Sequence, residues 1–226
     1  MLPVLIGIND CEPRDLFPGA VQAQPDSASP PERQRRSSAG RFVADQPNER
    51  LQADTTRWRL ADGTDVEILN IIDDHSRLAI GSDCRRTFKV GDVVDCFWTA
   101  IDRHGSPAGV LTDNGAIFTG QPRGHGMIAF ERQLAALDIQ LRHSRAYHPQ
   151  TCGKVERFHQ TVKRWLTAHD PATSLPELQA LLDEFIDVYN RRRPHRAVGR
   201  RTPSQAWHAR PRATSATVTT LSLIHI

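Results

Sequence analysis

Three acidic residues in different parts of the chain have residue types and local contexts that suit a divalent-cation site. Asp54 lies inside a strand-like run, Asp113 follows the apolar run AGVLT, and Glu156 lies early in a helix-like segment. Carboxylates gathered from separate elements repel one another unless cations lie between them. Because a site made only of oxygen ligands favours Mg²⁺ or Mn²⁺, these residues are candidate ligands for one of these ions.

Each acid also has an ordinary structural explanation. Asp54 is compatible with a solvated strand residue, Asp113 with a turn residue that bonds its own backbone, and Glu156 with an acid that complements a helix dipole. Spacing alone does not decide, because 26 acidic residues offer many such triples. Another acidic pair, Asp73 and Asp74, lies in a polar turn and is expected to be structural.

Hydrophobic periodicity predicts the elements that must position these residues. Strands are expected over residues 51–60, 66–73, 78–84, 108–112 and 139–141. Helices are expected from about residue 90 to before 105, and over 127–137, 153–168 and 174–189, the last opening with a capping box. The first three strands form an antiparallel meander. The order predicts an α/β fold with a mixed five-stranded sheet flanked by helices.

Composition divides the chain into four parts. Residues 1–48 are rich in Pro, Ser, Gln and Arg and are expected to form a disordered basic arm. Residues 49–193 carry the periodic core, 194–211 form a basic extension, and 212–226 form a disordered tail. The last six residues, LSLIHI, resemble an in-frame translation of a sequencing-library adapter, with a chance hexapeptide as the alternative. In the adapter interpretation, the natural protein is expected to be cut somewhere after Pro211. The four tryptophans (Trp58, Trp98, Trp165 and Trp207) are expected to pack in the core or between helices.

Composition also excludes several classes of protein. Hydrophobic residues make up 38% and charged residues 24%, which is ordinary for a soluble globular protein. No apolar run approaches the roughly 18 residues of a membrane span. The four cysteines form no CxxC pair, which predicts reduced thiols in the cytoplasm. The net charge is only +3, but basic residues concentrate between residues 140 and 201, where a polyanion would bind.

Several longer strings carry a family resemblance. QADTTRW, IIDDHSRLAIG, LTDNGAIFT, YHPQTCGKVERFHQTVKRW and YNRRRPHRAVGRRTPSQAW occur in this order. They resemble the insertion-sequence transposases of bacteria that carry a retroviral-integrase-type (rve) catalytic core of the DDE superfamily. The resemblance covers about residues 41–210. It implies a ribonuclease H-like fold and a catalytic DDE triad formed by Asp54, Asp113 and Glu156.

The resemblance also implies a reaction. Two Mg²⁺ or Mn²⁺ ions would clamp the scissile phosphate, with Asp54 bridging both ions while Asp113 and Glu156 hold one each. The implied activity is metal-dependent hydrolysis at element ends, followed by transfer of the 3′-hydroxyl into target DNA. The implied partner is double-stranded DNA, with no nucleotide cofactor and no membrane. A homo-oligomer on DNA is expected by analogy.

Basic and polar residues near the third acid are expected to bind DNA. Glu156, Gln160 and Lys163 fall on one helix face, and the resemblance supports DNA contacts from it. An arginine-rich loop follows the last predicted helix and suits a phosphate clamp. The expected set is Lys154, Arg157, Gln160, Lys163, Arg164, Arg191, Arg192, Arg193, Arg196, Arg200 and Arg201. For each basic residue in this set, the alternative is a solvent-exposed side chain that does not bind DNA.

The chain departs from the family pattern at three places. Leu51 stands where a Trp is common, Cys152 occupies a position that is more often polar, and residues 1–48 do not resemble the usual helix-turn-helix that reads inverted repeats. Two other functions stay open: a catalytically silent DNA-binding relic of a transposase, and a ribonuclease H-like structure-directed nuclease.

Overall fold

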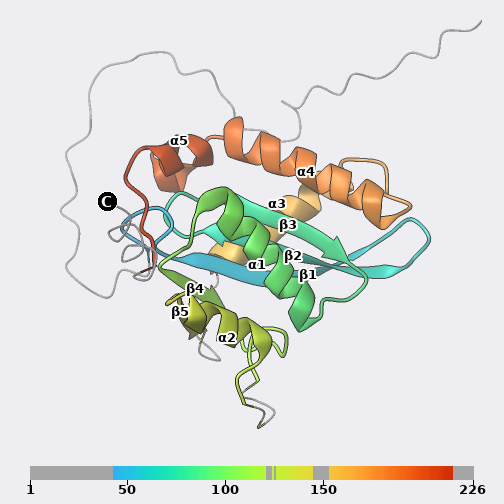
Figure 1. Ribbon diagram of the computed structural model, residues 1–226. Coiled ribbons are helices and arrows are strands. Elements are labelled where there is room, and N and C mark those ends of the chain that lie inside the picture. The colour runs from blue at the N-terminus through green and yellow to red at the C-terminus, as the bar shows by residue number, and fades with distance from the viewer. Residues whose placement is uncertain (1–42, 121–123, 125, 145–152, 216–226) are drawn as a thin grey trace, which may run out of the picture. The chain divides into compact units, whose positions relative to one another are not determined.

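The computed structural model describes residues 43–120, 124, 126–144 and 153–215, all within one compact unit. Residues 1–42 of the predicted arm and 216–226 of the predicted tail lie outside the described residues. The elements, labelled in Figure 1, are β1 (Leu51–Arg59), β2 (Asp65–Asp73), β3 (Ala79–Arg85), α1 (Val90–His104), β4 (Gly109–Thr112), α2 (Ala129–Ala136), β5 (Gln140–His143), α3 (Gly153–Thr167), α4 (Leu175–Arg191), the 3₁₀ turn η2 (Arg196–Val198) and α5 (Pro203–His208).

The five strands form one mixed sheet in the order β3-β2-β1-β4-β5. β2 pairs antiparallel with both β1 and β3, which confirms the predicted meander. β4 then joins β1, and β5 joins β4, in parallel. The predicted fold class is therefore confirmed. Strand β2 is buried on both faces, which explains its continuous apolar run.

Helices cover both faces of the sheet (Figure 1). On one face, α1 and α2 bury Phe97 and Phe130 against strand residues such as Leu51 and Val110. On the other face, α3 contacts β1 and β2, while α4 contacts β3 and α3. Aromatic rings join these two helices, because Phe158 of α3 packs 5.6 Å from Phe185 of α4. Each ring pair of this kind contributes roughly 0.5–1.5 kcal/mol beyond its buried area.

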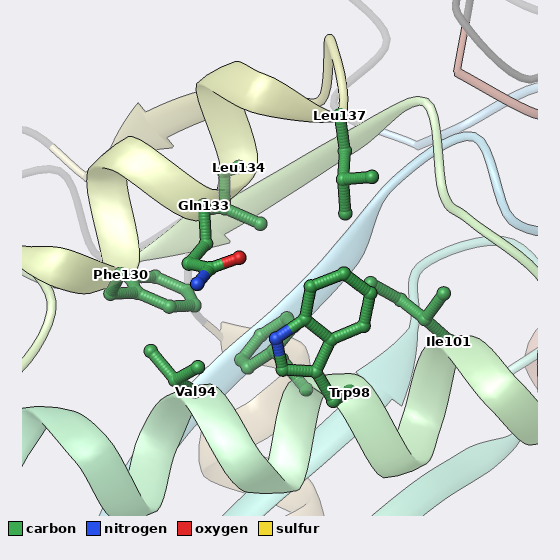
Figure 2. A pocket seen from close by; sticks show the side chains of 8 residues that line it. Val94, Trp98, Ile101, Phe130, Gln133, Leu134 and Leu137 are labelled. Carbon is green, nitrogen blue, oxygen red and sulfur yellow. The ribbon is translucent and has the colours of Figure 1, made fainter.

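The contact between α1 and α2 is an apolar seam, shown in Figure 2. Val94, Trp98 and Ile101 of α1 face Phe130 and Leu134 of α2 there. The indole of Trp98 packs against this seam but stays 42% exposed at its rim, whereas two of the other tryptophans, Trp165 and Trp207, are buried as expected.

Both ends of the described chain pack on the core, although the sequence predicts an arm to residue 48 and a tail from residue 212. Asn48 is fully buried, and its side-chain amide donates to the carbonyl oxygens of Ser106 and Ala213. The Ala213 amide donates to the Pro47 carbonyl at 2.8 Å, and Ser215 is buried. Composition did not indicate this packing, because it depends on hydrogen bonds between residues far apart in sequence.

None of the described helices combines the length and the apolar character needed to cross a membrane.

Candidate active site

Pairing of β1 with β4 brings Asp54 and Asp113 to neighbouring positions. The parallel register sets Leu51 opposite Val110 and Gln52 opposite Leu111. If this register is continued by two residues along each strand, Asp54 lies opposite Asp113. Adjacent strands lie about 4.8 Å apart, and the negative charge of Asp113 raises the pKa of Asp54. The two carboxyl groups therefore lie close enough for the charge of one to affect the other.

A tight turn after β4 orients Asp113. Its Oδ1 accepts a hydrogen bond from the Gly115 backbone N–H at 2.9 Å. A Cβ at Gly115 would lie 2.8 Å from the same Oδ1, so a side chain there would displace the Asp113 carboxylate from this position. The turn expected from the sequence is thus present, and it aims the Asp113 carboxylate as well as closing the loop.

Helix α3 brings Glu156 to the same region. His159 lies one turn after Glu156 on the same helix face, and its Nδ1 lies 4.0 Å from Asp54 Oδ2. The charge of Glu156 also raises the pKa of Asp54. The structure thus gathers the three predicted acids from β1, the loop after β4 and the first turn of α3.

His159 is a site residue that the sequence analysis did not identify. Its ring is buried, and its Nε2 has no hydrogen-bond partner among the described residues. Burial, and then the charge of Lys163, lower the pKa of His159 to about 4. The signal in the sequence was its position three residues after Glu156, which places the two side chains on one helix face.

Burial and nearby negative charges give Asp54 a raised pKa. Burial is the largest cause and the charge of Asp113 the next, and together they raise the pKa of Asp54 to about 6. The Thr55 N–H, which donates to Oδ1 at 2.8 Å, opposes this shift. A carboxyl group in this state is held near two like charges that disfavour its ionisation. A divalent cation among the three carboxylates would relieve that repulsion, so the oxygen donor set suits Mg²⁺ or Mn²⁺. Within the described residues, no three Asp, Glu, His or Cys side chains already form a metal-binding cluster.

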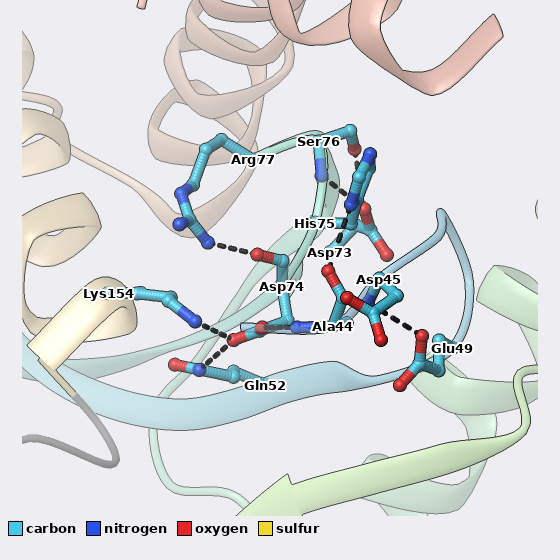
Figure 3. A network of polar contacts seen from close by, with 10 residues as sticks. All are labelled: Ala44, Asp45, Glu49, Gln52, Asp73, Asp74, His75, Ser76, Arg77 and Lys154. Carbon is cyan, nitrogen blue, oxygen red and sulfur yellow. Dashed lines mark hydrogen bonds and ion pairs between the residues drawn. The ribbon is translucent and has the colours of Figure 1, made fainter. Parts of the chain in front are cut away.

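The acidic pair in the β2–β3 turn has the structural role expected of it (Figure 3). Both carboxylates are fully buried. Asp73 accepts hydrogen bonds from the backbone N–H groups of Asn48 and Ser76. Asp74 accepts from Gln52 Nε2 at 2.5 Å and forms a 2.5 Å ion pair with Lys154 Nζ. Lys154, expected at the DNA surface, has only 18% of its side chain exposed and is engaged in this pair.

The other residues predicted to bind DNA from α3 lie on its outer surface. Arg157, Gln160 and Arg164 are exposed, and Lys163 is partly exposed. Helical spacing places Gln160 and Lys163 on the face of Glu156. These side chains are accessible to a polyanion, and their contacts with DNA stay a prediction.

The arginine-rich loop begins at the end of α4, which contacts β3, at the opposite edge of the sheet from β5. Arg191 pairs with Asp187 at 3.1 Å, and Arg193 stacks 5.5 Å from the Tyr189 ring centroid. The remaining four arginines are exposed: Arg192, Arg196, Arg200 and Arg201. Burial lowers the pKa of Arg193, and the charge of Arg164 in α3 lowers it further, so this part of the loop lies near α3.

His195 in this loop should make stability depend on pH. Its ring packs 4.7 Å from the Tyr189 ring, and burial, then Arg193 and Arg77, lower its pKa to about 4. Below pH 6.5 the unfolded chain binds a proton that the folded chain does not, so this part of the stability is lost as pH falls from about 6.5 to 4. We expect His195→Phe to weaken the dependence of the urea midpoint on pH between 7 and 5. The exposed His208→Gln serves as control, and an unchanged pH dependence in His195→Phe would refute the assignment.

Comparison with known families gives two matches, both to models described as integrase core domain. They match residues 44–149 and 137–203, and together span all three acidic positions. A protein named "Putative integrase ORF3" of Spiroplasma virus SpV1-C74 is 26% identical over 146 residues, which is 60% of this chain. The chain spans about 40% of the length of that relative.

Solved structures share the fold. The simian T-cell lymphotropic virus intasome, in complex with PP2A regulatory subunit B56 gamma, contains a chain that matches with a TM-score of 0.63 at 19% identity, covering 82% of this chain and 63% of that one. The HTLV-2 integrase catalytic core domain in complex with magnesium matches with a TM-score of 0.57 at 19% identity. That match covers 73% of this chain and 99% of the HTLV-2 chain.

Proposed function

Because this chain belongs to the integrase core domain family, we propose that it is the catalytic core of a DNA transposase. It cuts phosphodiester bonds at the ends of a mobile element and joins the new 3′-hydroxyl to target DNA. The observation that supports this most is the placement of Asp54 beside Asp113, with Glu156 of α3 close enough to raise the pKa of Asp54.

The first reaction is hydrolysis. A water oxygen attacks the phosphorus at the element end, the bond from phosphorus to the 3′ oxygen breaks, and a free 3′-hydroxyl and a 5′-phosphate remain. In the second reaction that hydroxyl attacks a phosphorus of the target strand and displaces the target's own 3′ oxygen. The second reaction forms one phosphodiester for each one broken, so no nucleotide hydrolysis is needed.

Asp54, Asp113 and Glu156 would hold the divalent cations, Mg²⁺ or Mn²⁺, which we propose number two. When bound, such ions stabilise charge on the attacking and departing oxygens. The protein's own contribution is orientation. The Gly115 N–H fixes the Asp113 carboxylate, and the Thr55 N–H fixes that of Asp54. His159, one turn after Glu156, lies against Asp54 and holds this part of α3 close to β1.

The proposed partner is double-stranded DNA, both element ends and target. Exposed Arg157 and Gln160, with partly exposed Lys163, follow the acidic site along α3 and would contact the DNA backbone. Because transposition needs the two element ends held together, we propose that the protein acts as a homo-oligomer on DNA. The HTLV-2 core structure, described as a trimeric form with magnesium, supports both the metal and the assembly.

The proposal is tested with the purified chain, Mg²⁺ or Mn²⁺, and labelled duplexes taken from the DNA that flanks its reading frame. We expect a nick at an element end and then a joined product. A branched duplex that mimics the joined product serves as a second substrate. Its separation into element end and target DNA is the reverse of joining, and this assay does not require the protein to recognise an element end. Binding without any cleavage would favour the silent relic, and cleavage without joining or its reverse would favour the nuclease.

A further inference from the structure

A hollow of about 240 Å³ lies at the start of β4 and β5, between two arginines that the sequence analysis did not single out. It is lined by Arg50 and Arg142, with Gly109 and Gln140 between them. Gly109 makes the room, because a Cβ there would lie 3.1 Å from the Gln140 carbonyl oxygen. The hollow is therefore built by the close approach of two backbones and flanked by positive charge.

Strand alternation places this hollow on the same sheet face as the acidic site. Leu51 and Val110 point into the core beneath α1, so the alternate positions point to the opposite face. In β4 these positions are Gly109 and Leu111, followed by Asp113. Arg142 is opposite Leu111 in β5, two residues before the level of Asp113. The arginines and the acids thus lie along one face of the sheet.

No described helix packs extensively on this part of the surface. α2 contacts β5 from the side of α1, whereas α3 contacts β1 and β2. Arg142 is exposed and Arg50 is partly exposed. Neither guanidinium forms an ion pair within the described residues. Glu49 also lines the hollow, but its carboxylate accepts hydrogen bonds from the backbone N–H groups of Asp45 and Gln46.

The charge and geometry suit a phosphate. Arg142 Nη2 donates to Gln140 Oε1 at 3.2 Å, which holds the guanidinium beside the hollow. Guanidinium groups bind phosphate oxygens through paired hydrogen bonds. Gly109 lies four residues before Asp113, about 13 Å along the strand, and phosphates of one DNA strand recur about every 3.4 Å along the helix axis. The hollow is thus a few nucleotides from the bond at the acids.

We propose that the hollow between Arg50 and Arg142 binds a backbone phosphate of the DNA strand whose bond is presented to Asp54 and Asp113. This rests on the DNA-processing function proposed above. The hollow sets the path of the strand across β4 and β5, at a distance from the arginine-rich loop after α4. The site carries no sequence information, because a phosphate contact positions DNA and does not read bases.

The test measures binding of the full chain to a labelled random-sequence duplex by fluorescence anisotropy, in EDTA and over a range of salt concentrations. We expect the double variant Arg50→Gln/Arg142→Gln to bind more weakly. Its slope of log K against log salt should fall by about 0.9, the value for one lost phosphate contact. The control is Arg103→Gln, an exposed arginine in the last turn of α1, the helix on the other sheet face. Circular dichroism and thermal unfolding establish that each variant is folded.

The outcomes separate this proposal from the proposed function. A salt slope in the double variant equal to that of the unsubstituted protein, or an equal loss in Arg103→Gln, would overturn the phosphate site whatever the activity. A protein that shows the expected slope change but neither cuts nor joins DNA with Mg²⁺ or Mn²⁺ would keep the phosphate site and overturn the transposase function.

Discussion

Asp113→Asn is expected to lower the rates of DNA cleavage and joining by roughly 10²- to 10³-fold, the loss typical for one preorganised electrostatic group. The substitution removes a negative charge beside Asp54 and leaves the size of the side chain almost unchanged. The replacement amide oxygen still accepts the hydrogen bond from the Gly115 N–H, so the turn after β4 should keep its shape. We therefore expect Asp113→Asn to lose activity while its folding stays largely unchanged.

The matched control is Asp138→Asn, which changes the same functional group at an exposed position after α2. Asp138 has a φ of 54°, a conformation that Asn adopts readily. Rates of nicking and joining, thermal unfolding and DNA affinity in EDTA are measured for both variants. If Asp113→Asn retained the rate of the unsubstituted protein, Asp113 would have no part in the reaction.

The sequence predicted the elements well because most of them carry their own hydrophobic period. Predicted strands 51–60 and 66–73 correspond to Leu51–Arg59 and Asp65–Asp73, and the predicted helix 153–168 corresponds to Gly153–Thr167. Ser174 begins the helix as predicted, since its Oγ accepts from the Glu177 N–H. The predicted capping box is only half formed, because the Glu177 carboxylate accepts from the Thr173 N–H and not from that of Ser174. Local signals of this kind need no knowledge of the rest of the chain.

The sequence alone could not supply the contacts between elements. Nothing in the composition predicts that β4 pairs with β1 in a register that aligns Asp54 with Asp113. Helix α5 is only six residues long, too short to give a clear period, and was not predicted. The burial of His159 depends on how α3 packs against β1, and the pairing of Lys154 depends on the β2–β3 turn. In each case the deciding partner lies far away in sequence.

The buried pair of Asp74 and Lys154 should have the largest effect on stability. Asp74→Asn removes the carboxylate that pairs with Lys154, whose side chain is 18% exposed. Removing one partner of a buried ion pair costs about 3–5 kcal/mol, whereas replacing both partners by neutral groups is often nearly neutral. We therefore expect Asp74→Asn to lower the free energy of unfolding by an amount in that range, and the double variant Asp74→Asn/Lys154→Met to recover much of the loss.

Urea unfolding of the two single variants and the double variant measures the coupling between the residues. The exposed pair of Arg59 and Asp65, 2.8 Å apart, is the control, and Asp65→Asn should change the unfolding free energy far less. If the effects of Asp74→Asn and Lys154→Met were simply additive, the ion pair would contribute nothing of its own.

Asp74 and Lys154 also connect β1, which carries Asp54, with α3, which carries Glu156. Asp74 Oδ1 accepts hydrogen bonds from Gln52 in β1 and from Lys154 in α3. Gln52 lies two residues before Asp54, and Lys154 lies two residues before Glu156. Loss of the carboxylate should therefore loosen α3 relative to β1, and Asp74→Asn should cleave DNA more slowly even at temperatures where it is fully folded. Affinity for DNA in EDTA should change little, because Asp74 is buried away from the surface.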